Sequence, residues 1–240
     1  MSKFQSKVPA ADWDRALEGG LQMSRPNLLD NWYFADPVNQ RGETEYTGPG
    51  YTIDRWKLPY NKSASVKIEC GGLLLTRNGE NAILEQKIPL DLTGVKVCIS
   101  GLTNEGLYSG TKTVDAINYT SPIRIPNVGD IQVFSSDGIT TFRIWVTIDE
   151  ASCKFKAVKL ELGDTQTLAR QDDSGGWVLN DPPPSKALEL LKCQRYFQRY
   201  RTESLRPTYA EDCRPVMCTE PTKGTITADG VTYYTLSADL

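Results

Sequence analysis

The sequence predicts an all-β protein, and three observations carry this prediction. Short apolar runs alternate with turn clusters between residues 27 and 163, at spacings of roughly 8–12 residues, as in a sandwich or a barrel. The chain contains 19 Gly and 14 Pro, a content that favours many turns over long helices. Its 240 residues fit one large all-β unit with smaller additions.

Nine segments have the composition and alternation of β-strands. In residues 140–148 the side chains of Phe142 and Ile144 point to one face, and those of Arg143 and Trp145 point to the other. The apolar set predicts the core face, so Trp145 is expected off the core. The other expected strands are residues 51–58, 64–71, 71–77, 82–90, 95–102, 123–127, 131–136 and 153–162.

The sequence predicts four consecutive parts. Residues 1–25 form an attachment segment, residues 26–163 the sandwich, residues 164–185 a linker, and residues 186–240 a small unit of helix and β-hairpin. A double glycine and a proline triplet mark the linker. The last part is short for an independent core, so we expect it to pack on the sandwich or to form oligomers.

Local signals support the two end parts. Asp12 is a good N-cap for a short helix in the attachment segment, where Trp13 either folds back on its own chain or docks on a neighbouring subunit. Ser185 is a good N-cap for a helix that begins the last part. Asp229-Gly230 between two β-rich runs predicts a hairpin with a two-residue turn.

The charge pattern argues against several classes of function. The formal net charge is −3 and the basic residues are dispersed, so we expect no nucleic-acid partner. No apolar run approaches the ~20 residues that span a bilayer, so we expect no membrane insertion. The start of the chain lacks the apolar region of a signal peptide. The sequence contains neither of the two glycine-rich loops that bind phosphate groups, so no cofactor is expected.

The chain contains no histidine. This excludes the usual general base of Ser and Cys hydrolases and the zinc motifs that need histidine. Chemistry by carboxylates alone, such as glycoside hydrolysis, stays open as an alternative, although no acid pair lies in a recognisable motif. We therefore expect a protein that is not an enzyme.

Six cysteines are too few for a disulfide-dependent scaffold, and most are interpreted as buried free thiols. Cys213 and Cys218 could form a disulfide or half of a metal site. No second Cys or His pair stands nearby in the sequence to complete four zinc ligands, so no metal site is expected.

Four ordered motifs carry a resemblance to known proteins. These are "NLLDNWYFADPVNQRG…GYTIDRWKL", "LEQKIPLDLTGVKVCISGL", "FKAVKLELGDTQTLA" and "LLKCQRYFQRY". In this order they resemble bacteriophage and prophage tail-fibre or appendage proteins, whose common element looks like the jelly-roll β-sandwich of carbohydrate-binding modules. The likeness spans most of residues 26–240.

The resemblance implies a virion structural protein, assembled in the host cytoplasm as a homotrimer. It implies that residues 1–25 contact other virion proteins and that the jelly roll is displayed outward for adhesion to host-surface glycans. Two alternatives stay open: a tail-borne glycan depolymerase that uses carboxylates, and a capsid-mounted head fibre or decoration protein without a ligand.

Exposed aromatic rings beside polar side chains are what a glycan site needs. Tyr108 and Tyr119 are expected in polar loops beside Asn104 and Asn118, with Trp145 on the face beneath them. These five residues are the candidate carbohydrate-binding residues.

Two other aromatic positions are expected to serve the fold. Trp56 is interpreted as a core residue. Residues 27–42 are expected to open the sandwich as its entry strand, with the consecutive Trp32, Tyr33 and Phe34 divided between the two faces.

Overall fold

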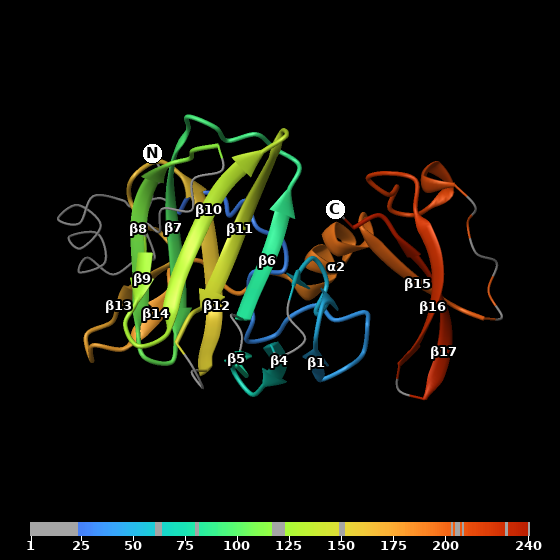
Figure 1. Ribbon diagram of the computed structural model, residues 1–240, viewed down its shortest axis with the longest axis horizontal. Helices are drawn as coiled ribbons and strands as arrows, with labels where there is room; N and C mark the ends of the chain where they lie inside the picture. Colours follow the sequence, from blue (N-terminus) through green and yellow to red (C-terminus); the bar gives the residue numbers. More distant parts are fainter. Residues whose placement is uncertain are drawn as a thin grey trace, which may run out of the picture.

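The computed structural model describes residues 24–240, except residues 61–63, 80–81, 117–122, 149–151, 203, 205–206, 208, 229 and 240. Within these residues most of the regular structure is β-strand, which confirms the predicted all-β class. Two six-stranded antiparallel sheets form a sandwich, and a three-stranded sheet stands beside it (Figure 1). The expected helix of the attachment segment lies outside the described residues.

The two sheets of the sandwich are called sheet A and sheet B. In spatial order, sheet A contains β1 (Glu45–Thr47), β4 (Ala64–Glu69), β5 (Gly72–Arg77), β12 (Ser152–Leu162), β7 (Lys96–Thr103) and β8 (Leu107–Thr113). Sheet B contains β2 (Gly50–Tyr51), β3 (Lys57–Leu58), β6 (Ala82–Ile88), β11 (Ile139–Val146), β10 (Gly129–Ser136) and β9 (Ile123–Ile125).

The alternation predicted for residues 140–148 is confirmed in β11. Phe142 and Ile144 are at most 1% exposed and belong to the core, whereas Trp145 is half-buried on the opposite face. Pairing with β6 and β10 keeps this order, because residues directly opposite each other in a ladder share a face. Sheet B therefore has one apolar inner face and one outer face that carries polar and aromatic side chains.

Residues 51–58 were expected to form one strand, and this expectation is wrong. They form a tight hairpin between β2 and β3, in which the Thr52 N–H donates to the Trp56 carbonyl at 2.8 Å. Arg55 at the tip has a φ of 73°, which breaks an extended chain. The turn places Trp56 in the core, as predicted, with no exposed surface.

Tyr108 was expected in a polar loop, and this expectation is also wrong, because it belongs to an extended segment, residues 107–113. They form β8, the edge strand beside β7, with Tyr108 opposite Gly101. An edge strand with little burial needs no run of apolar residues, so its sequence resembles that of a loop.

The entry segment, residues 27–42, contains no strand. Asn31 has a φ of 52°, and the Asp36 N–H closes a turn by donating to the Tyr33 carbonyl. The segment nevertheless lies beside β12, because the Val158 N–H donates to the Trp32 carbonyl at 3.1 Å. Only the first four residues of β12, Ser152 to Phe155, pair with β5. The entry segment contacts β12 further along the strand, at Val158.

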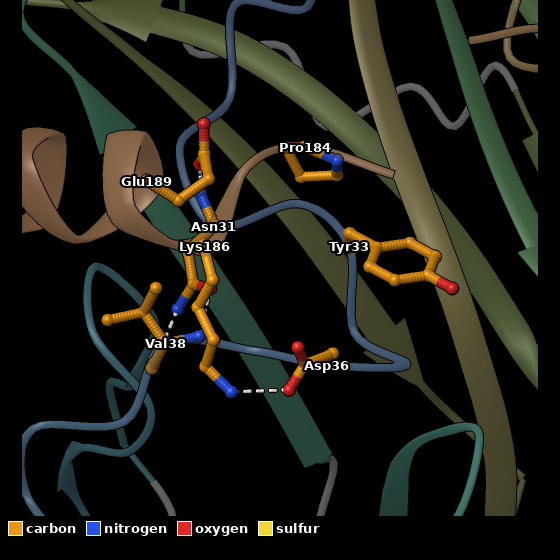
Figure 2. Close-up of a pocket in the computed structure, with 7 residues that line it drawn as sticks. All are labelled: Asn31, Tyr33, Asp36, Val38, Pro184, Lys186 and Glu189. Carbon is orange, nitrogen blue, oxygen red and sulfur yellow. Dashed lines mark hydrogen bonds and ion pairs between the residues drawn. The ribbon is translucent and has the colours of Figure 1, made fainter. Parts of the chain in front are cut away.

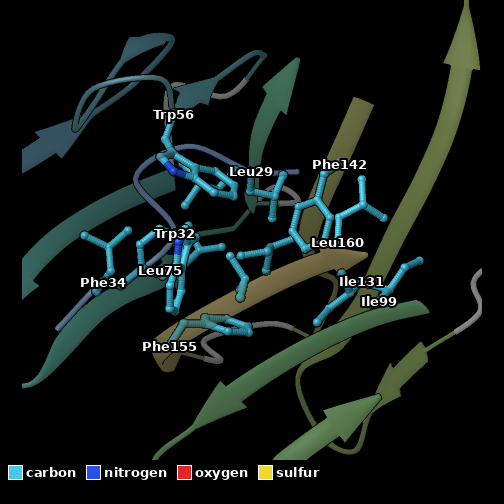
Figure 3. Close-up of a cluster of buried hydrophobic side chains, with 14 of the residues drawn as sticks. Leu29, Trp32, Phe34, Trp56, Leu75, Ile99, Ile131, Phe142, Phe155 and Leu160 are labelled. Carbon is cyan, nitrogen blue, oxygen red and sulfur yellow. The ribbon is translucent and has the colours of Figure 1, made fainter. Parts of the chain in front are cut away.

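The three consecutive aromatics divide as expected. Trp32 and Phe34 are buried in the core, and Tyr33 is half-buried against its rim. Phe34 packs edge-to-face on Trp56, with ring centroids 5.0 Å apart. Figure 3 shows these rings among the aliphatic side chains that both sheets contribute to one core.

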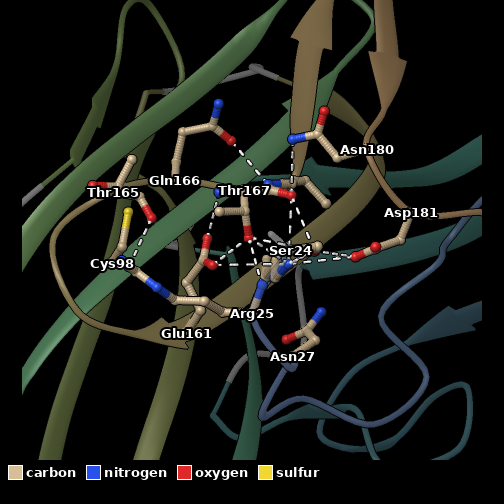
Figure 4. A network of polar contacts seen from close by, with 12 residues as sticks. Ser24, Arg25, Asn27, Cys98, Glu161, Thr165, Gln166, Thr167, Asn180 and Asp181 are labelled. Carbon is tan, nitrogen blue, oxygen red and sulfur yellow. Dashed lines mark hydrogen bonds and ion pairs between the residues drawn. The ribbon is translucent and has the colours of Figure 1, made fainter. Parts of the chain in front are cut away.

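The first part of the expected linker packs on the sandwich. Leu168 and Ala169 are buried in the same core, and a hairpin follows from β13 (Ala169–Gln171) to β14 (Trp177–Leu179). A polar network fixes this segment (Figure 4). In it the buried Lys159 ammonium donates to the Ser24 and Thr167 hydroxyls, both at 2.8 Å.

The C-terminal unit contains the expected helix and hairpin. The helix α2 (Lys186–Gln194) follows Ser185, whose side chain makes no capping hydrogen bond. After it come β15 (Phe197–Arg201), a 3-10 turn η1 (Ala210–Asp212), β16 (Thr222–Ala228) and β17 (Val231–Ser237). Ala228 pairs with Val231, which confirms the two-residue turn; Asp229 itself lies outside the described residues.

A buried ion cluster joins the C-terminal unit to the sandwich, and we call it the joint. The Arg41 guanidinium donates to Asp54 at 3.1 Å and to Asp239 at 2.6 Å, and the two carboxylates are at most 2% exposed. The same guanidinium lies 4.0 Å from the ring centroid of Phe197. The Gln40 side chain also donates to the Phe197 carbonyl at 2.9 Å.

Burial raises the pKa of Asp54 from 3.8 to about 6, while the Arg41 guanidinium and the Gln40 N–H act in the opposite direction. Burial also raises the pKa of Asp239. One guanidinium thus faces two carboxyl groups that both resist ionisation.

A second contact with the sandwich lies at the start of α2. The Asn31 N–H donates to the buried Glu189 carboxylate at 2.8 Å, and Lys186 pairs with Asp36 (Figure 2). The cavity between these residues has a volume of about 10 Å³, which is room for roughly one water. It is a packing contact and too small for an organic ligand.

Candidate functional site

The outer face of sheet B carries charged, polar and aromatic side chains in cross-strand rows. One row follows the register from Lys57 on β3 through Glu85 on β6 and Arg143 on β11 to Gln132 on β10. The next row contains Lys87, Thr141 and Phe134. Because paired residues share a face, both rows point away from the core.

Except for Gln132, the residues of these rows line a groove with a volume of about 350 Å³, which we call the sheet B groove. A volume of this size lies at the lower end of the range for small-molecule sites, roughly 300–1,000 Å³. The groove is lined by Lys57, Pro59, Tyr60, Glu85, Lys87, Phe134, Ser136, Asp137, Ile139, Thr141 and Arg143.

A buried ion pair holds the centre of the groove. Arg143 donates from Nε at 3.2 Å and from Nη2 at 2.8 Å to the same carboxylate oxygen of Glu85. Both side chains are less than a tenth exposed, so the pair is fixed in place before any ligand enters. Charge-assisted hydrogen bonds of this kind are stronger and shorter than neutral ones.

Two aromatic rings belong to the groove. Tyr60 is 70% exposed, the most exposed of the large hydrophobic side chains among the described residues. Phe134 is half-buried on β10, and the Arg143 guanidinium lies 5.0 Å from its ring centroid. An exposed ring and a ring fixed by a cation therefore line the same cavity.

The structure separates the residues predicted to bind carbohydrate. Tyr108 and Asn104 belong to sheet A and to the turn that precedes β8, where Tyr108 packs partly against the core. Trp145 lies on sheet B but does not line the groove. Asn118 and Tyr119 lie outside the described residues. Their proposed role in carbohydrate binding stays a prediction.

Trp145 faces Asp130 across the ladder, beside the row that contains Arg143. The indole nitrogen of Trp145 and one carboxylate oxygen of Asp130 are buried, and neither has a hydrogen-bond partner among the residues that the structure describes. The predicted position of Trp145 off the core face is therefore correct. Its polar atom, however, is turned away from solvent.

The groove residues were missed for a clear reason. Glu85, Lys87, Phe134 and Arg143 all occupy outward positions of correctly predicted strands, so the alternation contained the signal. What the sequence did not give was the strand order β3-β6-β11-β10, which brings these positions together. Tyr60 follows β3 in the chain, where nothing marked it.

The described ranges contain neither a candidate metal site nor a candidate membrane-spanning helix. Among them no three Cys, Asp or Glu residues gather as a metal site would require, and all six cysteines are free thiols. None of the helices described is long and apolar enough to cross a membrane.

Comparison with family models, with curated proteins and with solved structures finds no match for this chain. The resemblance to phage appendage proteins therefore stays a prediction.

Proposed function

We propose that this chain is a glycan-binding protein that is not an enzyme, and that it holds a saccharide in the sheet B groove. The observation that carries the proposal is the pairing of two groove-lining rings, Tyr60 and Phe134, with the buried Arg143–Glu85 ion pair.

The chemistry of sugars explains why this combination fits. The C–H faces of a sugar ring pack on aromatic rings, and its hydroxyls need fixed donors and acceptors. Tyr60 offers the exposed ring, and Glu85 and Thr141 offer oxygen atoms on the floor. A tyrosine 70% exposed gains apolar contacts only when a ligand covers it.

We also propose that the sandwich is a jelly roll and part of a trimeric phage appendage. Its connections cross repeatedly between the sheets, from β5 to β6, from β6 to β7, from β8 to β9 and from β11 to β12. Two late strands, β11 and β12, each insert between earlier ones, as in Greek-key sandwiches. The virion placement and the contacts through residues 1–25 derive from the resemblance alone.

A glycan array tests the binding. We expect the wild type to bind a subset of saccharides, and Tyr60→Ala and Phe134→Ala to lower the affinity about tenfold each, since stacking contacts contribute roughly 1–1.5 kcal/mol. Tyr209→Ala is the matched control, because Tyr209 is an exposed tyrosine of the C-terminal unit. Equal losses in all three variants, or no binding by the wild type, would contradict the proposal.

A glycosidase is the second candidate, because two carboxylates, Glu85 and Asp137, line the groove. The test is polysaccharide turnover by the wild type, Glu85→Gln and Asp137→Asn. We expect no turnover by any of them. Turnover that one of these substitutions abolishes would replace the binding proposal with the enzymatic one.

Light scattering after size-exclusion chromatography tests the trimer. We expect a mass of three chains at micromolar concentration. A stable monomer would contradict the predicted assembly.

A further inference from the structure

Two lysine side chains line the sheet B groove without a carboxylate partner. Lys57 on β3 and Lys87 on β6 both belong to the lining, and no ion pair with either is found among the residues that the structure describes. The Lys57 ammonium lies 5.2 Å from the ring centroid of Tyr51. Within the described part of the chain, neither positive charge is therefore ion-paired with an acid.

The acids of the groove have other partners. Glu85 stands directly opposite Lys57 in the register, yet it accepts both of its hydrogen bonds from Arg143. Asp137 is in the turn between β10 and β11 and accepts a hydrogen bond from the Ser136 hydroxyl at 2.9 Å. Neither carboxylate is therefore hydrogen-bonded to a lysine.

The net charge of the groove lining is consequently opposite in sign to the net charge of the whole chain. Among the described residues the lining contains three cations, Lys57, Lys87 and Arg143, and two carboxylates, Glu85 and Asp137, which gives +1. The chain as a whole carries −3. A local positive field within an acidic protein attracts anions to one place.

We infer that the groove selects acidic saccharides, in which a carboxylate or sulfate contacts Lys57 and Lys87 while the sugar ring packs on Tyr60. This inference rests on the proposed function. An ammonium group is a point charge that accepts either anion, whereas the guanidinium, which reads planar carboxylates in two-pronged geometry, is already occupied by Glu85. Carboxylated and sulfated saccharides thus share the features that the groove would recognise, a sugar ring and a negatively charged group.

The strand register supports one orientation of the ligand. Lys57 on β3 lies directly opposite Glu85, and Lys87 lies two residues further along β6 in the next row. Phe134 lies two strands from Lys87 in that row. An anionic group therefore lies at the β3–β6 side of the groove, and the uncharged part of the saccharide lies toward β10.

The test is an array in which each uronate-bearing oligosaccharide is printed with its methyl ester, and each sulfated one with its unsulfated form. We expect the acidic member of a pair to bind at least tenfold more tightly. Raising the NaCl concentration from 50 to 500 mM should weaken binding of the acidic member and leave binding of the neutral member unchanged.

Lysine variants locate the charge effect. Lys57→Gln and Lys87→Gln should each reduce affinity for the acidic member about fivefold and leave the neutral member unchanged. Lys223→Gln, on exposed β16, is the matched control and should change neither. Circular dichroism of each variant checks that the fold is retained.

The outcomes separate this inference from the proposed function. Equal binding of both members with loss in Tyr60→Ala would overturn the acidic preference and leave glycan binding in place. Binding of neutral sugars alone would do the same. Absence of binding to every saccharide would overturn both.

Discussion

The sandwich and the C-terminal unit are stabilised in different ways. The sandwich contains a core of 33 buried hydrophobic residues among those described, contributed by both sheets. The C-terminal unit has a separate core of 5, namely Ala210, Cys213, Met217, Leu236 and Ala238. Since hydrophobic stabilisation grows with the apolar area buried, the unit depends on its attachment to the sandwich far more than the sandwich depends on the unit.

The joint makes this dependence specific. Arg41 is the one cation hydrogen-bonded to both Asp54 and Asp239 in the described structure, and Asp239 is in the last residues of the chain. A buried ion pair contributes little by itself, but removing one partner leaves a buried charge without compensation. The attachment is therefore sensitive to single substitutions.

The largest effect is expected in the sandwich core. Trp56→Ala removes a fully buried ring that packs on Phe34 and Phe142, and should lower the free energy of unfolding by about 3–5 kcal/mol. Leu236→Ala should cost about 2–3 kcal/mol and affect the C-terminal unit alone. Urea unfolding with hydrogen exchange measures both. Equal loss of protection throughout the chain in both variants would contradict the comparison.

The next effect is expected at the joint. Arg41→Met leaves the Asp54 and Asp239 carboxylates without the guanidinium that is hydrogen-bonded to both, which should cost about 3 kcal/mol. We expect proteolysis within the C-terminal unit to accelerate while the sandwich stays resistant. Arg170→Met, an exposed arginine on β13, is the matched control.

A rescue experiment tests the electrostatic cause. Combining Arg41→Met with Asp54→Asn and Asp239→Asn removes the unpaired charges, so much of the lost stability should return. If the triple variant is as labile as Arg41→Met, lost packing of the Arg41 side chain on Phe197 is the better explanation.

The joint should also respond to pH. The pKa of Asp54 is raised from 3.8 to about 6 in the folded protein, so the folded state binds the proton more tightly than the unfolded state does. Between about pH 4 and 6 the free energy of unfolding should therefore fall as pH rises, by on the order of 2–3 kcal/mol, and then level off.

Urea unfolding at pH 4.5 and 7.5 measures this change. Asp54→Asn should remove the share of this change that Asp54 contributes, while Asp239, whose pKa burial also raises, still titrates in the same direction. Exposed acids also contribute to the pH dependence; one is Asp164, whose pKa is lowered by its hydrogen bond with Lys96. Their contribution is the same in the wild type and in Asp54→Asn, so it cancels when the two proteins are compared. A wild type that gains stability over this range relative to Asp54→Asn would contradict the assignment.

The comparison also explains what the sequence could predict. Alternation identified β11 and the core position of Phe142, because burial on one face leaves a period of two in the sequence. It could not identify β8, where neither face is deeply buried. It could not identify the joint, since Arg41 and Asp239 are 198 residues apart and no local pattern links them. The groove could not be predicted for the same reason, because only the order of the strands in sheet B brings its residues together.

The smallest predicted effect concerns Gly42, where the sandwich touches β16 of the C-terminal unit. Gly42 has a φ of 86°, and a Cβ atom there would lie 2.4 Å from the Cβ of Ala228. Gly42→Ala should cost about 1–2 kcal/mol, because it adds both backbone strain and a clash at the attachment. Gly175→Ala is the matched control, since Gly175 has a φ of 81° and open space around it.

Gly42→Ala adds both strain and a clash, whereas Gly175→Ala adds strain alone. The difference between their losses of unfolding free energy therefore measures the clash. Ala228→Gly removes the opposing Cβ but also destabilises β16, so the effect of Gly42→Ala is compared in the Ala228→Gly background and in the wild type. In the Ala228→Gly background Gly42→Ala should cost only what backbone strain requires. Hydrogen exchange of the β16–β17 amides measures the loss. If Gly42→Ala costs as much in both backgrounds, the two units are not in close contact at Gly42. The dependence of the C-terminal unit on the sandwich would then derive from Arg41 and α2 alone.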